Sequence, residues 1–194
     1  MTTRLKLICH ASTAALRTSA FPADEPLDIQ GRQKLTSLPW RAHYADRYLT
    51  SPALRSVQTA EVLKLTTTVE PMLRDCDYGR WTGRSLDEIQ ADEPEAVTEW
   101  LHDPGTAPHG GESLLALIER VATWLDAQKA TPGKIVAVTH ASVIRAAIVH
   151  AIEAGPRSFW HIDVPPLSLT WLSANNGRWV LSALGAMDAE PTAQ

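Results

Sequence analysis

Short apolar runs rich in β-branched residues alternate along this chain with longer segments in which apolar residues recur every three or four positions. The short runs are typical of buried strands, and the longer segments are typical of amphipathic helices. Strands are expected at residues 5–9, 47–50, 66–70 and 135–139. The pattern predicts an α/β fold, a three-layer sandwich in which helices cover both faces of a mainly parallel sheet.

The clearest helical pattern lies in residues 112–128, where apolar side chains at positions 114, 117, 118, 121 and 125 fall on one face. Other helices are expected at residues 27–38, 52–63, 85–90, 93–101 and 142–152. Ser51 and Pro52 are expected to be the N-cap and the first helical residue of the helix at 52–63. Asn176-Gly177 separates two alternating segments, which predicts a β-hairpin that adds an antiparallel strand.

Two of the expected strands end alike, because His10-Ala11-Ser12 follows the first and His140-Ala141-Ser142 follows the last. Ligands of open α/β sheets bind outside the carboxyl ends of the strands. If these two strands are parallel neighbours, His10 and His140 face one crevice. Arg55, near the start of a helix that follows another strand, is expected at the same edge. Two imidazoles there could be a nucleophile and a charge-stabilising group, or a pair of metal ligands.

Composition narrows the classes of function. The 194 residues suffice for one domain, expected at 1–185, and residues 186–194 are expected to form a loose tail. A formal net charge of −4 without a basic run argues against nucleic acid or an anionic membrane as a partner. Cys9 and Cys76 offer no disulfide framework. The sequence lacks a signal-peptide pattern and an apolar run of membrane-spanning length, so the expectation is a soluble cytoplasmic protein.

With these residues placed, the chain resembles the histidine phosphatase superfamily, whose fold is that of phosphoglycerate mutase. The most specific likeness is Ser51–Glu61, which is similar to the family segment Ser-Pro-Leu-x-Arg-x-x-Gln-Thr-Ala-Glu. Leu73–Gly83 resembles Leu-x-Glu-x-x-x-Gly-x-Trp-Glu-Gly, with Asp75 at the acidic position, and Asp24–Gly31 resembles Asp-x-Pro-Leu-Thr-x-x-Gly. The family opens with Arg-His-Gly, where this chain has Cys9-His10-Ala11.

The resemblance implies a metal-independent phosphatase that needs no cofactor and hydrolyses a small phosphorylated metabolite through a phosphohistidine. His10 would attack phosphorus, and His140 and Arg55 would bind the phosphoryl group. Asp75 would protonate the leaving oxygen, which requires a raised pKa, and Asp77 is the alternative acid. A mutase is disfavoured because the extra basic residues that would hold a bisphosphate intermediate are not found.

Two other interpretations stay open. A degenerate member of the family would bind a phosphorylated or other anionic ligand with little or no turnover. A metal site built from His10, His140 and a carboxylate is disfavoured, because no recognised ligand spacing is present. Cys9 is disfavoured as a nucleophile, because the Cys-x5-Arg spacing of cysteine phosphatases is missing.

Cys9 stands where the family has its motif arginine, so catalysis would be weakened unless another cation compensates. Arg17 is the predicted substitute, and Ser12 and Thr13 are expected to contact the substrate beside it. The alternative is that Arg17 pairs with a carboxylate of the acidic segment at residues 24–25.

Overall fold

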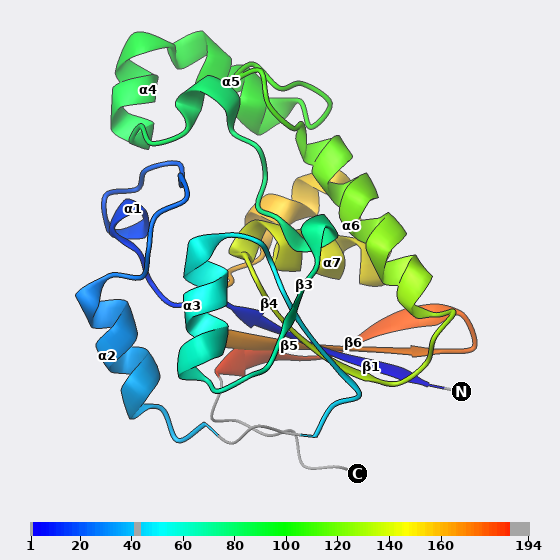
Figure 1. Ribbon diagram of the computed structural model, residues 1–194. Helices are drawn as coiled ribbons and strands as arrows, with labels where there is room; N and C mark the ends of the chain where they lie inside the picture. The colour runs from blue at the N-terminus through cyan, green and yellow to red at the C-terminus, as the bar shows by residue number, and fades with distance from the viewer. Residues whose placement is uncertain (1, 41–43, 187–194) are drawn as a thin grey trace.

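A six-stranded sheet forms the centre of the structure, a computed structural model that describes residues 2–40 and 44–186 (Figure 1). The strands lie in the order β3-β2-β4-β1-β5-β6. Their bounds are β1 Thr3–Cys9, β2 Arg47–Thr50, β3 Thr68–Val69, β4 Lys134–Thr139, β5 Ser168–Asn175 and β6 Arg178–Ala186. The first four strands in this order pair in parallel, and β5 and β6 join them antiparallel. The predicted sheet and its C-terminal hairpin are confirmed.

Seven α-helices and three short 3-10 helices connect the strands in the described part of the chain. The α-helices are α1 Ala14–Arg17, α2 Ile29–Ser37, α3 Leu54–Val62, α4 Leu86–Asp92, α5 Pro94–His102, α6 Leu114–Gln128 and α7 Ala141–Ala151. The 3-10 helices are η1 Pro71–Leu73, η2 Gly79–Trp81 and η3 Pro156–His161. None of the described helices is both long and apolar enough to cross a membrane.

Each face of the sheet carries its own hydrophobic core, because successive strand residues point to opposite faces. On one face, Leu5, Leu7 and Ile135 are buried against α6 and α7. On the other face, Ile8 and Val138 are buried against α2 and α3. Helices therefore cover both faces of the sheet, as the sequence predicted (Figure 1).

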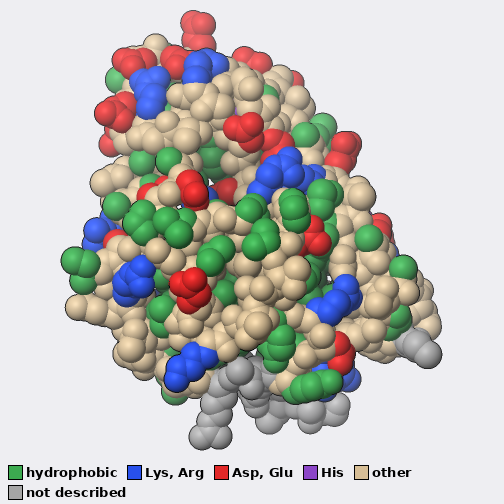
Figure 2. All heavy atoms as spheres, in the orientation of Figure 1, with side chains coloured by type: hydrophobic (Ala, Val, Ile, Leu, Met, Phe, Trp, Pro, Cys, Tyr) green, Lys and Arg blue, Asp and Glu red, His purple; other side chains and the backbone are tan. Residues whose placement is uncertain are grey.

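The segment that holds α4 and α5 forms a separate lobe, at the top of Figure 1. Side chains of both charge signs lie on its surface in Figure 2. A small aromatic and aliphatic core holds the lobe together and consists of Phe21, Trp81, Ile89 and Val97. Trp100 of α5 lines the same pocket as His10, so the lobe supplies one wall of the candidate site.

The start of α3 differs from the prediction. Ala53, rather than Ser51, is the N-cap, and the helix begins at Leu54. The Ser51 hydroxyl lies 2.7 Å from His140 Nε2 instead. The same oxygen also accepts a hydrogen bond from the backbone N–H of Ala53 at 3.3 Å, but the helix starts after Ala53, so the expected cap is wrong and Pro52 precedes the helix. The predicted tail at residues 186–194 lies outside the described residues, except for Ala186, the last residue of β6.

Candidate active site

The ends of β1 and β4 bring His10 and His140 together. The two strands are parallel neighbours in which Cys9 pairs with Thr139, so the next residue of each leaves the sheet at the same place. The imidazole centroids lie 5.1 Å apart, with the rings at 68°. His10 lines a pocket of about 210 Å³, and Arg55 and Asp75 line it too. The sequence-based expectation that both histidines meet at one sheet edge is confirmed.

The hydrogen bond of His10 fixes which of its nitrogens is available for reaction. Its Nδ1 lies 2.7 Å from the carbonyl oxygen of Ala11. A carbonyl only accepts, so Nδ1 carries the proton and Nε2 keeps its lone pair. Burial first, and then the charge of Arg55, lower the pKa of His10 below its ordinary value. The ring is therefore a neutral imidazole with a free Nε2, which is the form required of a nucleophile.

His140 is hydrogen-bonded through one ring nitrogen and lies close to Asp75 with the other. Nε2 contacts Ser51, and Nδ1 lies 3.2 Å from Asp75 Oδ2, although the two are not aligned as a hydrogen bond. Burial lowers the pKa of His140 to about 3, outweighing the opposing effect of Asp75. His140 is thus neutral near pH 7 when no anion is bound.

Arg55 occupies the first turn of α3 and is only 2% exposed. Its Nη1 donates to the carbonyl oxygen of Ala23 at 2.6 Å, and its Nη2 donates to Asp75 Oδ2 at 2.7 Å. Glu25 Oε2 lies 4.0 Å from Nη1, and both Glu25 carboxylate oxygens are buried without a hydrogen bond from a described residue. The guanidinium is therefore held between two carboxylates, Glu25 and Asp75.

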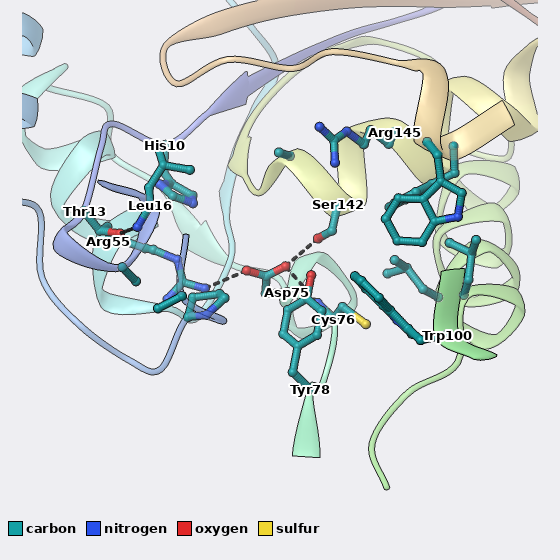
Figure 3. Close-up of a pocket in the computed structure, with 18 residues that line it drawn as sticks. His10, Thr13, Leu16, Arg55, Asp75, Cys76, Tyr78, Trp100, Ser142 and Arg145 are labelled. Carbon is teal, nitrogen blue, oxygen red and sulfur yellow. Dashed lines mark hydrogen bonds and ion pairs between the residues drawn. The ribbon is translucent and has the colours of Figure 1, made fainter. Parts of the chain in front are cut away.

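Asp75 lies at the centre of the pocket and accepts several hydrogen bonds (Figure 3). Arg55 and the hydroxyl of Ser142 donate to it, and so does the backbone N–H of Cys76, at 2.9 Å. Burial acts to raise the pKa of Asp75, but the charge that His140 carries when it is protonated at low pH, the guanidinium of Arg55 and the Ser142 hydroxyl outweigh burial and hold the pKa below its usual range. The structure therefore lowers the pKa of Asp75, where the sequence analysis expected it to be raised.

Asp77, the alternative acid, is not among the described residues that line the pocket. Its Oδ1 accepts a hydrogen bond from the backbone N–H of Gly79 at 2.9 Å, which stabilises the turn before η2. Of the two aspartates, the structure brings only Asp75 to the histidines.

Arg17 does not occupy the place predicted for it. Its Nε lies 3.5 Å from Asp28 Oδ2, its side chain is 48% exposed, and it is not among the described residues that line the pocket. Asp28 is fixed as the N-cap of α2 through the backbone N–H of Gly31, at 2.6 Å. The structure therefore does not place Arg17 in the pocket as the predicted second phosphoryl-binding cation, and its partner is Asp28 rather than a carboxylate of the segment at 24–25.

The two small polar residues beside Arg17 have different roles. Thr13 lines the pocket and also caps α1, where its Oγ1 accepts from the N–H of Leu16 at 3.4 Å. The Ser12 hydroxyl donates to Asp28 Oδ1 at 3.2 Å and is not among the described lining residues. Of this pair, only Thr13 remains placed to contact a substrate.

We expect Arg17→Ala to change kcat/KM for a phosphomonoester by less than about threefold, because Arg17 is not among the residues that line the pocket and its exposed ion pair with Asp28 contributes little to folding. Arg32→Ala is the matched control, because it removes an arginine that is also exposed but lies on the neighbouring helix α2. Steady-state kinetics measure the effect. A loss of about thirtyfold or more in Arg17→Ala alone, at an unchanged melting temperature, would show that Arg17 reaches the substrate.

Several site residues were missed or left undecided by the sequence analysis. Ser142 and Arg145 line the pocket from the first two turns of α7. Tyr78, just before η2, and Trp100, in α5, line it as well. The sequence could have indicated Ser142 and Arg145, because both follow His140 and residues three apart on a helix share a face. The sequence does not show which tryptophan faces the pocket: Trp100 lines it, whereas Trp81 is completely buried in the lobe.

The metal interpretation finds no support in the geometry. No group of three or more histidine, cysteine or carboxylate side chains in the described part of the chain is arranged to hold a metal ion.

Comparison with known proteins agrees with this geometry. Residues 5–186 match the histidine phosphatase superfamily (branch 1). Phosphoserine phosphatase 1 of Hydrogenobacter thermophilus is 26% identical over 192 residues, covering 93% of this chain and 91% of that protein. The solved structure of a mycobacterial glucosyl-3-phosphoglycerate phosphatase in complex with VO3 superposes with a TM-score of 0.81 at 25% identity, covering 95% of this chain and 99% of that one.

A longer relative is also similar. A bifunctional protein of Mycobacterium tuberculosis is 28% identical over 189 residues, covering 86% of this chain. The match covers 50% of that protein, so the chain spans about half the length of this relative.

Proposed function

This chain belongs to branch 1 of the histidine phosphatase superfamily, and from that premise we propose that it is a metal-independent phosphatase that hydrolyses a small phosphorylated metabolite through a phosphohistidine. The observation that carries the proposal is the neutral His10, whose free Nε2 belongs to a pocket shared with Arg55 and Asp75. Phosphoserine phosphatase and glucosyl-3-phosphoglycerate phosphatase, the similar proteins, support the reaction class.

The first step transfers the phosphoryl group to the protein. The lone pair of His10 Nε2 forms a bond to phosphorus while the bond from phosphorus to the alcohol oxygen breaks. Asp75, in its protonated form, gives its proton to that oxygen, and the alcohol leaves neutral. In the second step water attacks the phosphohistidine, Asp75 takes a proton from this water, and His10 Nε2 regains its lone pair as phosphate departs.

The Arg55–Asp75 pair explains how an aspartate with a low pKa can act as an acid. A bound phosphoryl group competes with Asp75 for the guanidinium of Arg55, because both are anions that fit its fork. Once Arg55 turns to the phosphoryl group, Asp75 loses a stabilising cation and gains an anionic neighbour. Both changes raise its pKa, so the acid form is expected only in the substrate complex.

Cys9 does not supply the charge of the motif arginine. Burial raises the pKa of its thiol to about 12, with Asp75 adding to the effect, so the side chain is neutral near pH 7. This favours a second candidate function, the binding of a phosphorylated ligand with little turnover, because Arg55 is then the main cation of the phosphoryl site and is already paired with Asp75.

An assay with a panel of phosphomonoesters in the presence of a chelator separates these functions. We expect turnover that the chelator leaves unchanged, with an acid-labile phosphoprotein trapped by rapid quenching. Binding of the same esters without any turnover would support the degenerate member instead. Turnover that disappears with the chelator and returns with a divalent metal would overturn the metal-independent mechanism.

A further inference from the structure

Arg120 of α6 and Glu112 form an ion pair behind the candidate active site. Their side chains are 7% and 9% exposed, and neither residue is among the described residues that line the pocket. Nε of Arg120 donates to Glu112 Oε1 and Nη2 donates to Glu112 Oε2, each at 2.7 Å, so the contact is bidentate. Two parallel bonds hold the guanidinium in one orientation, which fixes what its remaining N–H groups can reach.

The remaining N–H groups of Arg120 bind the backbone of the segment that carries Asp75. Nη1 donates to the carbonyl oxygens of Met72 and Arg74, at 2.6 and 3.1 Å. Nη2 donates to the carbonyl oxygen of Asp75 itself, at 3.3 Å. With the two bonds to the carboxylate, all five N–H donors of the guanidinium have an acceptor. One buried side chain therefore fixes the backbone at residues 72–75.

Glu112 fastens the other end of the same segment. Its backbone N–H donates to the carbonyl oxygen of Asp77 at 2.7 Å, and its carbonyl oxygen accepts from Cys76 Sγ at 3.5 Å. This close approach requires glycine at position 111, because a Cβ there would lie 2.1 Å from the Asp77 carbonyl oxygen. The ion pair and its flanking backbone thus hold the chain on both sides of Asp75.

The Asp75 side chain loses one of its own anchors during the reaction. In the ligand-free site its carboxylate accepts from Arg55 and from Ser142, as Figure 3 shows. In the mechanism proposed above, Arg55 turns to the phosphoryl group when substrate binds. Aspartate has a single methylene between its backbone and its carboxyl group, so its reach towards the leaving oxygen then depends on where its backbone is held.

We propose that Arg120 is a positioning residue of the reaction, and that its ion pair with Glu112 keeps the backbone at residues 72–75 where the Asp75 carboxyl reaches the leaving oxygen. This inference rests on the phosphatase function proposed above. Arg120 acts through Asp75 and does not itself contact the reacting atoms. Misplacing a catalytic group by about 1 Å can cost about a hundredfold in rate, so the loss of Arg120 should appear in proton transfer to the leaving group.

The test compares two esters whose leaving groups differ in their need for a proton, propyl phosphate and 2,4-dinitrophenyl phosphate. Propoxide leaves only with the help of an acid, whereas 2,4-dinitrophenolate is stable enough to leave without one. In Arg120→Met we expect kcat/KM to fall about a hundredfold for propyl phosphate and less than about threefold for the dinitrophenyl ester. Asp75→Asn, which removes the acid itself, should show a selective loss of the same kind.

Arg47→Met is the matched control, because Arg47 also binds α6 but lies at the start of β2, away from the carboxyl ends of the strands. Its Nη1 donates to Gln128 Oε1 at 2.8 Å, and its Nη2 donates to the carbonyl oxygen of Thr131 at 3.1 Å. This variant should keep the wild-type ratio of the two esters. An equal fall for both esters in Arg120→Met, or an unchanged rate for propyl phosphate, overturns the proposal.

Two further variants separate positioning from folding, because removing Arg120 alone leaves Glu112 as an uncompensated buried charge. The double variant Arg120→Met with Glu112→Met removes both charges and should show the same selective loss at a higher melting temperature. Arg120→Lys keeps the charge but cannot form the fork and bind three carbonyl groups at once, so it should fold and still lose activity on propyl phosphate selectively. Failure of all three variants to fold would show that the pair is needed for the fold itself, which overturns a positioning role.

Crystal structures keep the inference testable if the wild type hydrolyses neither ester. We expect the Asp75 backbone to be displaced by about 1 Å in Arg120→Met and to stay in place in Arg47→Met. Absent turnover with this displacement would contradict the phosphatase function alone, and absent turnover without it would contradict both inferences. Turnover by the wild type with an unchanged ester ratio in Arg120→Met would contradict the role of Arg120 alone.

Discussion

Replacing His10 with alanine is expected to lower kcat for any phosphomonoester substrate by about 10⁴-fold or more, because the phosphoryl group then has no acceptor. The loss should appear in kcat rather than in binding. Arg55 and the aromatic walls of the pocket remain, so inorganic phosphate should still bind with an affinity within about tenfold of that of the wild type. Initial rates and phosphate calorimetry on the same preparation measure both quantities.

His102→Ala is a suitable control for this variant, because His102 is an exposed residue at the end of α5 whose Nδ1 lies 2.8 Å from the backbone oxygen of Thr98. It should retain wild-type kcat. If His10→Ala kept more than about a tenth of the wild-type rate, His10 would not be the nucleophile, and a water-mediated attack would have to replace the phosphohistidine.

Replacing Arg55 with alanine is expected to affect catalysis and folding at once. Removing a charged donor that acts on the transferring group should cost about 10³-fold in kcat/KM. The substitution also leaves Asp75 and Glu25 without the cation between them, and breaking a buried pair in this way typically costs about 3–5 kcal/mol of folding stability. Urea unfolding at several pH values measures the second effect.

The stability loss in Arg55→Ala should depend on pH in a defined direction. In the wild type, Arg55 helps to hold the pKa of folded Asp75 below 3.8, its ordinary value. That stabilisation is present above pH 3.8 and fades as the pH falls through the lower folded pKa. The gap between wild type and variant should therefore be widest near pH 7 and narrow below about pH 4.

Arg55→Lys tests whether the charge or the fork matters, since lysine keeps the cation but cannot form two parallel hydrogen bonds. It should restore much of the stability while catalysis stays impaired. A stability gap in Arg55→Ala that is equally large at pH 7 and pH 3 would show that packing, and not the ion pair with Asp75, is what Arg55 contributes to folding.

The sequence was sufficient for the parts of the site that local pattern determines. His10 and His140 each follow a short apolar run, and the parallel alignment of those two strands then forces the rings together. Arg55 could be placed because it lies near the start of a helix that follows another strand of the same sheet. These inferences need only strand direction and helix position, which periodicity encodes.

The sequence could not predict which hydrogen-bond or ion-pair partner a loop residue takes in the folded protein. Arg17 had three acidic residues nearby in the chain, and Asp28 is the partner because a β-bridge between Thr13 and Leu27 brings the two segments together. The pKa of Asp75 likewise depends on Arg55, twenty residues away, and on Ser142, sixty-seven residues away. The same is true of Ser51, because local sequence favoured a helix cap, whereas the tertiary contact with His140 engaged its hydroxyl.

The position of Arg55 between Glu25 and Asp75 also bears on what happens after the reaction. When inorganic phosphate leaves the pocket, Arg55 would not stay unpaired, because Asp75 would form its ion pair with Nη2 again. Under the proposed mechanism, Asp75 would replace phosphate at Arg55 as the product leaves, so its carboxylate would compete with the product for the guanidinium. The expected consequence is weak product inhibition, so that hydrolysis would continue in a solution already rich in phosphate.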